Sequence, residues 1–137
     1  MSDAISHQTA IIYAMVLVSA SDAKMTDSEL LTIGDVITHF PVFRDFPRDR
    51  LMTVAEECAV ILSDPEGLDA VLGLIEEGLP DKLRETAYAA AVEVAAADEV
   101  VNQEELRVLE RLRHRLEIER LFAGAIERSA RARHMTL

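Results

Sequence analysis

The chain has 137 residues, half of them hydrophobic, and its 14 basic and 25 acidic side chains give a formal net charge of −11. This length predicts a single domain over residues 1–137, and the apolar content is too high for a disordered chain. The acidity argues against nucleic-acid binding, because that affinity comes from Lys and Arg side chains that neutralise phosphates.

Helical spacing of apolar residues dominates the chain, and no segment alternates apolar and polar residues for long enough to predict a strand. Residues 5–20 are almost continuously apolar, which predicts a central helix buried on most sides. Asp64 and Pro65 predict the N-cap and the first position of a later helix. The other apolar stripes predict helices over about 30–40, 51–62, 65–78, 80–97, 106–116 and 121–126. The sequence therefore predicts an all-α fold, a compact bundle of about seven helices.

Two connectors interrupt this helical pattern. The segment 40–47 is apolar but contains two prolines, which prevent regular structure and predict a connector that lies against the core. Gly78 and Pro80 predict the boundary between the fourth helix and a long alanine-rich fifth helix. None of the connectors is long enough to separate domains.

The chain contains an internal repeat with an offset of 76 residues. Residues 21–29 align with residues 97–105, and the buried helix before each segment and the amphipathic helix after it align as well. Two copies are too few for a solenoid. The repeat instead predicts two similar helix–acidic turn–helix hairpins, packed about a pseudo-twofold axis.

Part of each acidic turn is explained by helix capping. Thr26 and Glu29 have the spacing of a capping box, in which each side chain bonds to the backbone amide of the other residue. Asn102 and Glu105 can make the same exchange in the second copy. Asp22 and Asp98 lack such an explanation, because each is predicted at a helix C-terminus, where the helix dipole disfavours a negative charge.

A divalent cation offers an alternative explanation for the acidic turns. Ca²⁺ and Mg²⁺ bind carboxylate, carbonyl and water oxygens, but each turn is too short for an EF-hand loop. A cation site would therefore need both turns, with four carboxylates converging: Asp22, Glu29, Asp98 and Glu105. Capping with solvated surface charge and cation binding both remain open from the residues alone.

The repeated Val-x-x-x-Asp-x-x-x-Thr/Asn-x-x-Glu-Leu pattern resembles the tellurite-resistance TerB-like family, over about residues 11–113. The fuller copy runs from Val94 through Asp98 to Leu106. The resemblance implies a seven-helix bundle with an internal duplication, an association with resistance to tellurite and other stresses, and membrane-embedded partners. It also implies a metal-binding site, which by position transfers to Asp22, Glu29, Asp98 and Glu105. The glycine that usually follows the aspartate in this family is replaced by Ala23 and Glu99.

The sequence lacks the motifs of common enzyme classes. It has no Gly-rich phosphate loop, no His-Glu-x-x-His pair and no serine nucleophile elbow. Cys58 lies on the apolar stripe of its helix, which predicts an inert core thiol rather than a metalloid ligand. Four scattered histidines predict surface positions: His7, His39, His114 and His134. We therefore expect no enzymatic activity and no organic cofactor.

Cysteine use and hydropathy predict the cellular setting. A single cysteine is typical of a reducing cytosol, and no apolar run reaches the roughly 20 residues that span a bilayer. Residues 1–10 carry Asp3 and no Lys or Arg, which argues against a signal peptide. We expect a cytoplasmic protein without direct membrane insertion.

The basic residues are concentrated near the C-terminus. Residues 1–106 hold 6 basic and 21 acidic side chains, whereas residues 107–137 hold 8 arginines and 4 glutamates. The arginines either complement helix dipoles, or form a docking patch, or pack against the acidic surface of the protein itself.

Two functions remain open from the sequence. One is a stress-response module that binds a divalent cation, Ca²⁺ or Mg²⁺, through the acidic turns. The other is a helical interaction domain whose acidic surface docks a basic protein partner without a metal.

Overall fold

The computed structural model describes residues 4–19, 26–97 and 103–137. Within these ranges the chain forms seven α-helices and three short 3₁₀ helices, and no strand. The α-helices are α1 (His7–Ser19), α2 (Asp27–His39), α3 (Leu51–Leu62), α4 (Gly67–Gly78), α5 (Arg84–Ala97), α6 (Gln103–Arg115) and α7 (Arg120–Arg133). The 3₁₀ helices are Pro41–Phe43, Arg48–Arg50 and Asp81–Leu83. The predicted all-α bundle is confirmed, while the pseudo-twofold relation of the two hairpins stays a prediction.

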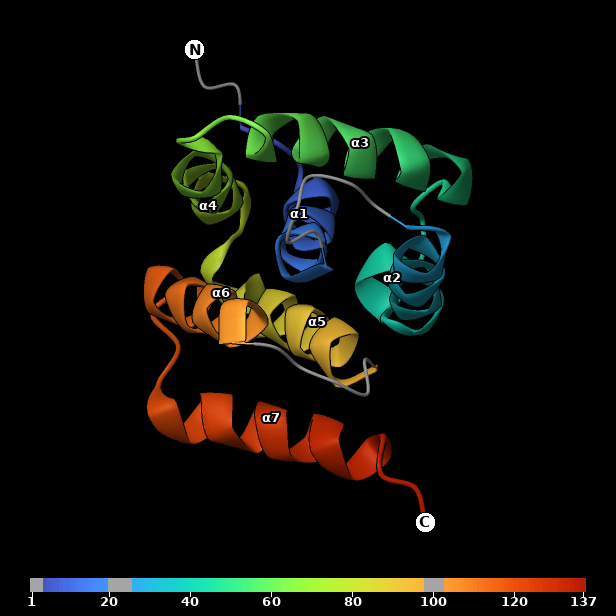
Figure 1. Cartoon of the computed structure of the whole chain (residues 1–137), viewed down its shortest axis with the longest axis vertical. Coiled ribbons are helices and arrows are strands. Elements are labelled where there is room, and N and C mark those ends of the chain that lie inside the picture. The colour runs from blue at the N-terminus through green and yellow to red at the C-terminus, as the bar shows by residue number, and fades with distance from the viewer. Residues whose placement is uncertain (1–3, 20–25, 98–102) are drawn as a thin grey trace.

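Helix α1 is the centre of the bundle (Figure 1). Every residue from Ala10 to Val18 is buried, which agrees with the continuous apolar run in this part of the sequence. Helices α3, α4, α5 and α6 all contact α1. A helix that is apolar on all sides is stable only when neighbours cover it on all sides, so helices α2 to α6 pack around α1.

The connector between α2 and α3 lies against this core, as its apolar sequence predicts. Phe43 and Phe46 are buried and pack edge to face, with ring centroids 5.8 Å apart. Pro41 begins a 3₁₀ helix rather than an irregular segment, because its fixed φ suits a first helical position. The two aromatic rings fix the path of the chain from α2 to α3.

The predicted start of α4 is wrong by two residues. Asp64 does not cap a helix at Pro65; its Oδ1 accepts a hydrogen bond from the backbone N–H of Glu66 at 2.9 Å. This turn competes with helix formation, as short polar side chains often do, and α4 begins at Gly67. A Cβ atom at Gly67 would lie 2.2 Å from the carbonyl oxygen of Ile61. The close approach of the chain to the end of α3 therefore requires glycine.

Helix α5 connects the core to the C-terminal part of the chain. Its buried alanines allow a close approach to α1: Ala87, Ala90, Ala91 and Ala95. Helices α6 and α7 also contact α5, whereas contacts between α6 and α7 themselves are few. The two C-terminal helices therefore both pack on α5 but pack little against each other.

Candidate functional site

Glu29 and Glu105 line one pocket of about 130 Å³. Glu29 belongs to the first turn of α2 and Glu105 to the first turn of α6, so they come from the two predicted hairpins. Three hydroxyl side chains line the same pocket: Ser19, Ser28 and Thr32. The fold thus brings together two of the four predicted ligands, which are 76 residues apart in the sequence, beside further oxygen-bearing groups.

Glu29 takes part in the predicted capping box, which is confirmed. The Thr26 backbone N–H donates to Glu29 Oε1 at 2.9 Å, and the Glu29 backbone N–H donates to Thr26 Oγ1 at 3.1 Å. An ionised carboxylate has two oxygens and about four lone-pair positions. The capping bond therefore leaves acceptor capacity on Glu29, and capping does not exclude a second role.

Glu105 is buried, with 9% of its surface exposed. Burying a carboxylate is costly unless it is paired or hydrogen-bonded, although the N-terminus of α6 favours a negative charge. This burial was not predicted from the sequence. The helical spacing of α6 does indicate this burial, because Glu105 stands four residues before Leu109 and seven before Leu112, on the apolar stripe of the helix.

The other two predicted ligands, Asp22 and Asp98, lie outside the described residues, as do Ala23, Glu99 and Asn102. Within residues 4–19, 26–97 and 103–137, no group of three or more His, Cys, Asp or Glu side chains is placed to hold a metal ion. Of the four predicted ligands, the structure therefore describes two, Glu29 and Glu105.

Cys58 is fully buried in α3, and burial raises the pKa of its thiol to about 12. The thiolate is the nucleophile and the metal ligand of cysteine chemistry, so a thiol with this pKa is unreactive in the folded protein. This agrees with the prediction of an inert core cysteine.

Glu93 of α5 holds the C-terminal end of α7. Its carboxylate accepts hydrogen bonds from Arg133 and from His134, the latter at 2.7 Å. Burial raises the pKa of Glu93, but the hydrogen bonds and positive charges of His134 and Arg133 outweigh burial and lower the pKa below its ordinary value. His134 is thus a structural partner, a role that its position in the sequence did not indicate.

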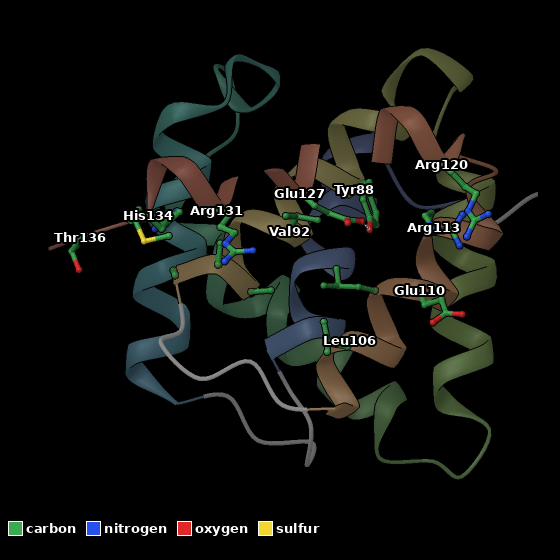
Figure 2. Close-up of a pocket in the computed structure, with 15 residues that line it drawn as sticks. Tyr88, Val92, Leu106, Glu110, Arg113, Arg120, Glu127, Arg131, His134 and Thr136 are labelled. Carbon is green, nitrogen blue, oxygen red and sulfur yellow. Dashed lines mark hydrogen bonds between the residues drawn. The ribbon is translucent and has the colours of Figure 1, made fainter. Parts of the chain in front are cut away.

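An open groove of about 1100 Å³ lies between α6 and α7, over α5 (Figure 2). We call it the α6–α7 groove. Val92 and Ala95 of α5 lie at its base, and arginines from both flanking helices line it. The groove was not predicted from the sequence, because the sequence of neither helix indicates the distance at which the two helices pack.

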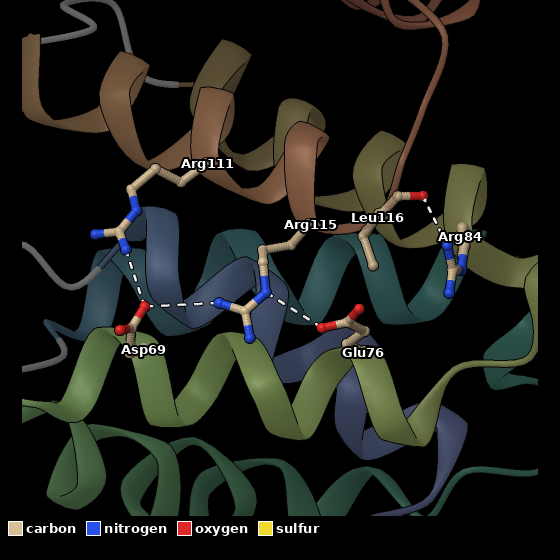
Figure 3. Close-up of polar contacts among 6 residues, drawn as sticks. All are labelled: Asp69, Glu76, Arg84, Arg111, Arg115 and Leu116. Atoms are coloured by element: carbon tan, nitrogen blue, oxygen red, sulfur yellow. Dashed lines mark hydrogen bonds and ion pairs between the residues drawn. The ribbon is translucent and has the colours of Figure 1, made fainter.

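Arginines on the other side of α6 are bound to acidic residues of α4 (Figure 3). Arg111 donates to Asp69 at 2.9 Å, and Arg115 donates to Glu76 at 3.2 Å while lying 3.6 Å from Asp69. With Arg133 on Glu93, three of the C-terminal arginines pack against the acidic surface of the protein itself. The predicted packing of C-terminal arginines against the acidic surface of the protein is therefore confirmed for Arg111, Arg115 and Arg133.

The family model for tellurite resistance protein TerB matches residues 8–126, which includes both hairpins and the first half of α7. The chain belongs to the TerB family. Comparisons with curated proteins and with solved structures find no match. In the part of the TerB-family chain that the structure describes, none of the helices has the length and apolar character needed to cross a bilayer.

Proposed function

We propose that this TerB-family chain is a non-catalytic, tellurite-resistance-associated module that binds a divalent cation weakly. Its ligands are Asp22, Glu29, Asp98 and Glu105, and Ca²⁺ or Mg²⁺ is the preferred ion. The observation that supports this proposal is the pocket shared by Glu29 and Glu105, one residue from each hairpin.

The chemistry of the pocket suits a hard cation. Ca²⁺ and Mg²⁺ bind carboxylate, carbonyl and water oxygens, and Glu29 and Glu105 supply two carboxylates to this pocket. Two carboxylates about 4 Å apart repel each other by roughly 4 kcal/mol at an effective dielectric constant near 20. A bound cation relieves such repulsion without protonating either group, so binding stabilises the fold.

The expected affinity is low, because few protein ligands are available and the turns lack the family's glycines. A dissociation constant of about 10⁻⁴–10⁻³ M is typical of modest calcium sites. At ten times that concentration, binding contributes about 1.4 kcal/mol to stability. For a domain of this size, the melting temperature rises by roughly 4–6 °C.

The test is a thermal melt with and without Ca²⁺ or Mg²⁺, supported by isothermal titration calorimetry. The Glu29→Gln/Glu105→Gln variant should lose the cation response. Glutamine at position 29 still accepts the capping bond, because capping boxes use Glu or Gln at this position. Glu104→Gln is the matched control, since Glu104 lies in the same turn of α6 as Glu105 but does not line the pocket.

The proposal fails if neither cation shifts the melting temperature of the wild type. It also fails if the double variant and Glu104→Gln respond equally. The Asp22→Asn/Asp98→Asn variant then tests the remaining two ligands in the same way, with the same expected loss.

The second candidate is docking of a basic protein partner, without a metal. It is supported by a surface of α3 where Met52, Glu56 and Val60 are exposed at a four-residue spacing, which places them along one face of the helix. A basic amphipathic segment, as in a membrane-embedded partner, has the complementary chemistry. A partner that binds the Asp22→Asn/Asp98→Asn variant as well as the wild type, but loses binding to Glu56→Lys, would favour this function.

A further inference from the structure

The α6–α7 groove combines an apolar base with positively charged walls. Leu106 of α6 borders the groove and is 49% exposed, whereas Leu109 and Leu112 of the same helix are buried. Arg113 lines it from α6, and Arg120 and Arg131 line it from α7. Met135, which follows α7, also lines the groove and is 62% exposed. Two exposed apolar side chains therefore lie in one groove beside arginines from two helices, and an apolar patch with a polar rim is typical of a binding surface.

These three arginines have no carboxylate partner among the residues that the structure describes. Arg113 is instead 3.1 Å from the ring nitrogen of His114. This contrasts with the C-terminal arginines outside the groove that are bound to Asp69, Glu76 and Glu93.

The acidic residues of the groove are directed to other groups. Glu127 accepts a hydrogen bond from the Tyr88 hydroxyl at 2.5 Å, and Glu110 lies 3.9 Å from His114. The three groove arginines therefore remain available for an external anion.

The positive charges lie at both ends of the groove. Figure 2 places Arg113 and Arg120 at one end and Arg131 at the other, with Val92 and Tyr88 between them. Arg120 and Arg131 are eleven residues apart on α7, which is about three turns and about 16 Å along the helix axis. A ligand that uses both ends must carry anionic groups separated by a similar length, with an apolar face between them.

We propose that the α6–α7 groove docks an acidic amphipathic helix of a partner protein. Such a helix lays its apolar face into a groove, and its carboxylates at either end of that face meet the arginines. A fatty acid carries its anion at one end only and leaves the other arginines unsatisfied. A symmetric contact with a second copy of this chain would bring arginines against arginines, and a membrane of anionic lipids repels a protein with a net charge of −11.

The test is selection of helical peptides with the full chain as bait. The displayed peptides have about 15 residues, enough for about four turns, with leucines fixed along one face and all other positions randomised among Ala, Gln, Glu and Lys. We expect selection to enrich glutamate at both ends of the peptides. Affinities of the selected peptides are then measured by fluorescence anisotropy.

Two matched pairs of variants locate the binding surface. Arg120→Glu/Arg131→Glu should weaken binding by about tenfold or more, because rim charges meet the ligand directly. Arg107→Glu/Arg128→Glu makes the same change of charge at one exposed arginine of α6 and one of α7, both outside the groove, and should change affinity by less than about twofold. Leu106→Asp should also weaken binding, whereas Leu121→Asp, at an exposed leucine outside the groove, should not.

Three results would overturn the proposal. The first is a selection without enrichment of glutamate, or peptides that bind both arginine variants equally. The second is binding to phosphatidylserine vesicles that depends on Arg120 and Arg131, since this assigns the groove to a membrane surface. The third is a dimer in sedimentation experiments that Arg120→Glu/Arg131→Glu dissociates, since this assigns the groove to a second copy.

Discussion

The two sides of α6 use arginine in opposite ways. On the side of α4, Arg111 and Arg115 are one turn apart and bind Asp69 and Glu76 (Figure 3). Arg113 lies between them in the sequence but points away from both, because residues two apart on a helix do not share a face. It lines the α6–α7 groove, where no carboxylate of the described residues binds it. The same residue type thus fixes the fold on one side and leaves a charged, open surface on the other.

Truncating one leucine of α6 in the core and one on the groove gives the largest expected contrast in stability. Leu112 is fully buried, and Leu112→Ala should lower the free energy of unfolding by about 2–5 kcal/mol, since a cavity remains. Leu106→Ala, on the groove, should cost less than about 1 kcal/mol, because that side chain is half exposed already. Urea denaturation followed by circular dichroism measures both. Equal losses would show that the groove is part of the core.

Removing the contact between α5 and the end of α7 should have an intermediate effect on the free energy of unfolding, and this effect should depend on pH. Glu93→Gln should lower the free energy of unfolding by about 1.5 kcal/mol at neutral pH, as expected for hydrogen bonds to a charged group. The pKa of Glu93 is lowered in the folded state, so its stabilisation is present above the ordinary glutamate pKa and is lost as the pH falls through the folded value.

The difference in stability between wild type and Glu93→Gln should therefore shrink as the pH is lowered below about 4.5. Urea titrations from neutral to acidic pH measure it. A difference that stays constant over this range would mean that Arg133 and His134 do not stabilise the ionised carboxylate.

The smallest expected difference in stability is between alanine variants of an arginine on the α4 side and of one in the groove. Arg115→Ala removes contacts to two carboxylates, but Asp69 is exposed and Glu76 partly exposed, so the loss should be about 0.5–1 kcal/mol, and smaller at high salt. Arg120→Ala, in the groove, should change stability by less than about 0.5 kcal/mol. Thermal melts at low and high salt compare the two. A stability loss for Arg120→Ala as large as that for Arg115→Ala would mean that the groove arginines maintain the fold.

Local sequence patterns predicted the helices and many of their ends, although α5 begins at Arg84 rather than at Pro80 and α7 continues to Arg133 rather than ending near residue 126. The apolar run over residues 5–20 predicted a central helix that is buried on most sides, and α1 is that helix. Thr26 and Glu29 predicted a capping box, because both bonds join residues three apart. The resemblance to the TerB family was carried by short motifs of the same kind. The start of α4 was wrong, because the turn formed by Asp64 and the close approach at Gly67 depend on the end of α3.

The sequence by itself determined seven helices, a central apolar helix among them, and a basic C-terminal segment. The helices follow from spacings of a few residues, which fix the face of a helix on which a side chain lies. The basic segment follows from the residue composition alone. Only the tertiary structure decided that Glu29 and Glu105 share a pocket, that Arg115 reaches Glu76, and that α6 and α7 leave a groove between them. Helical spacing places a residue on a face, but the packing of helices far apart in the sequence decides what that face meets.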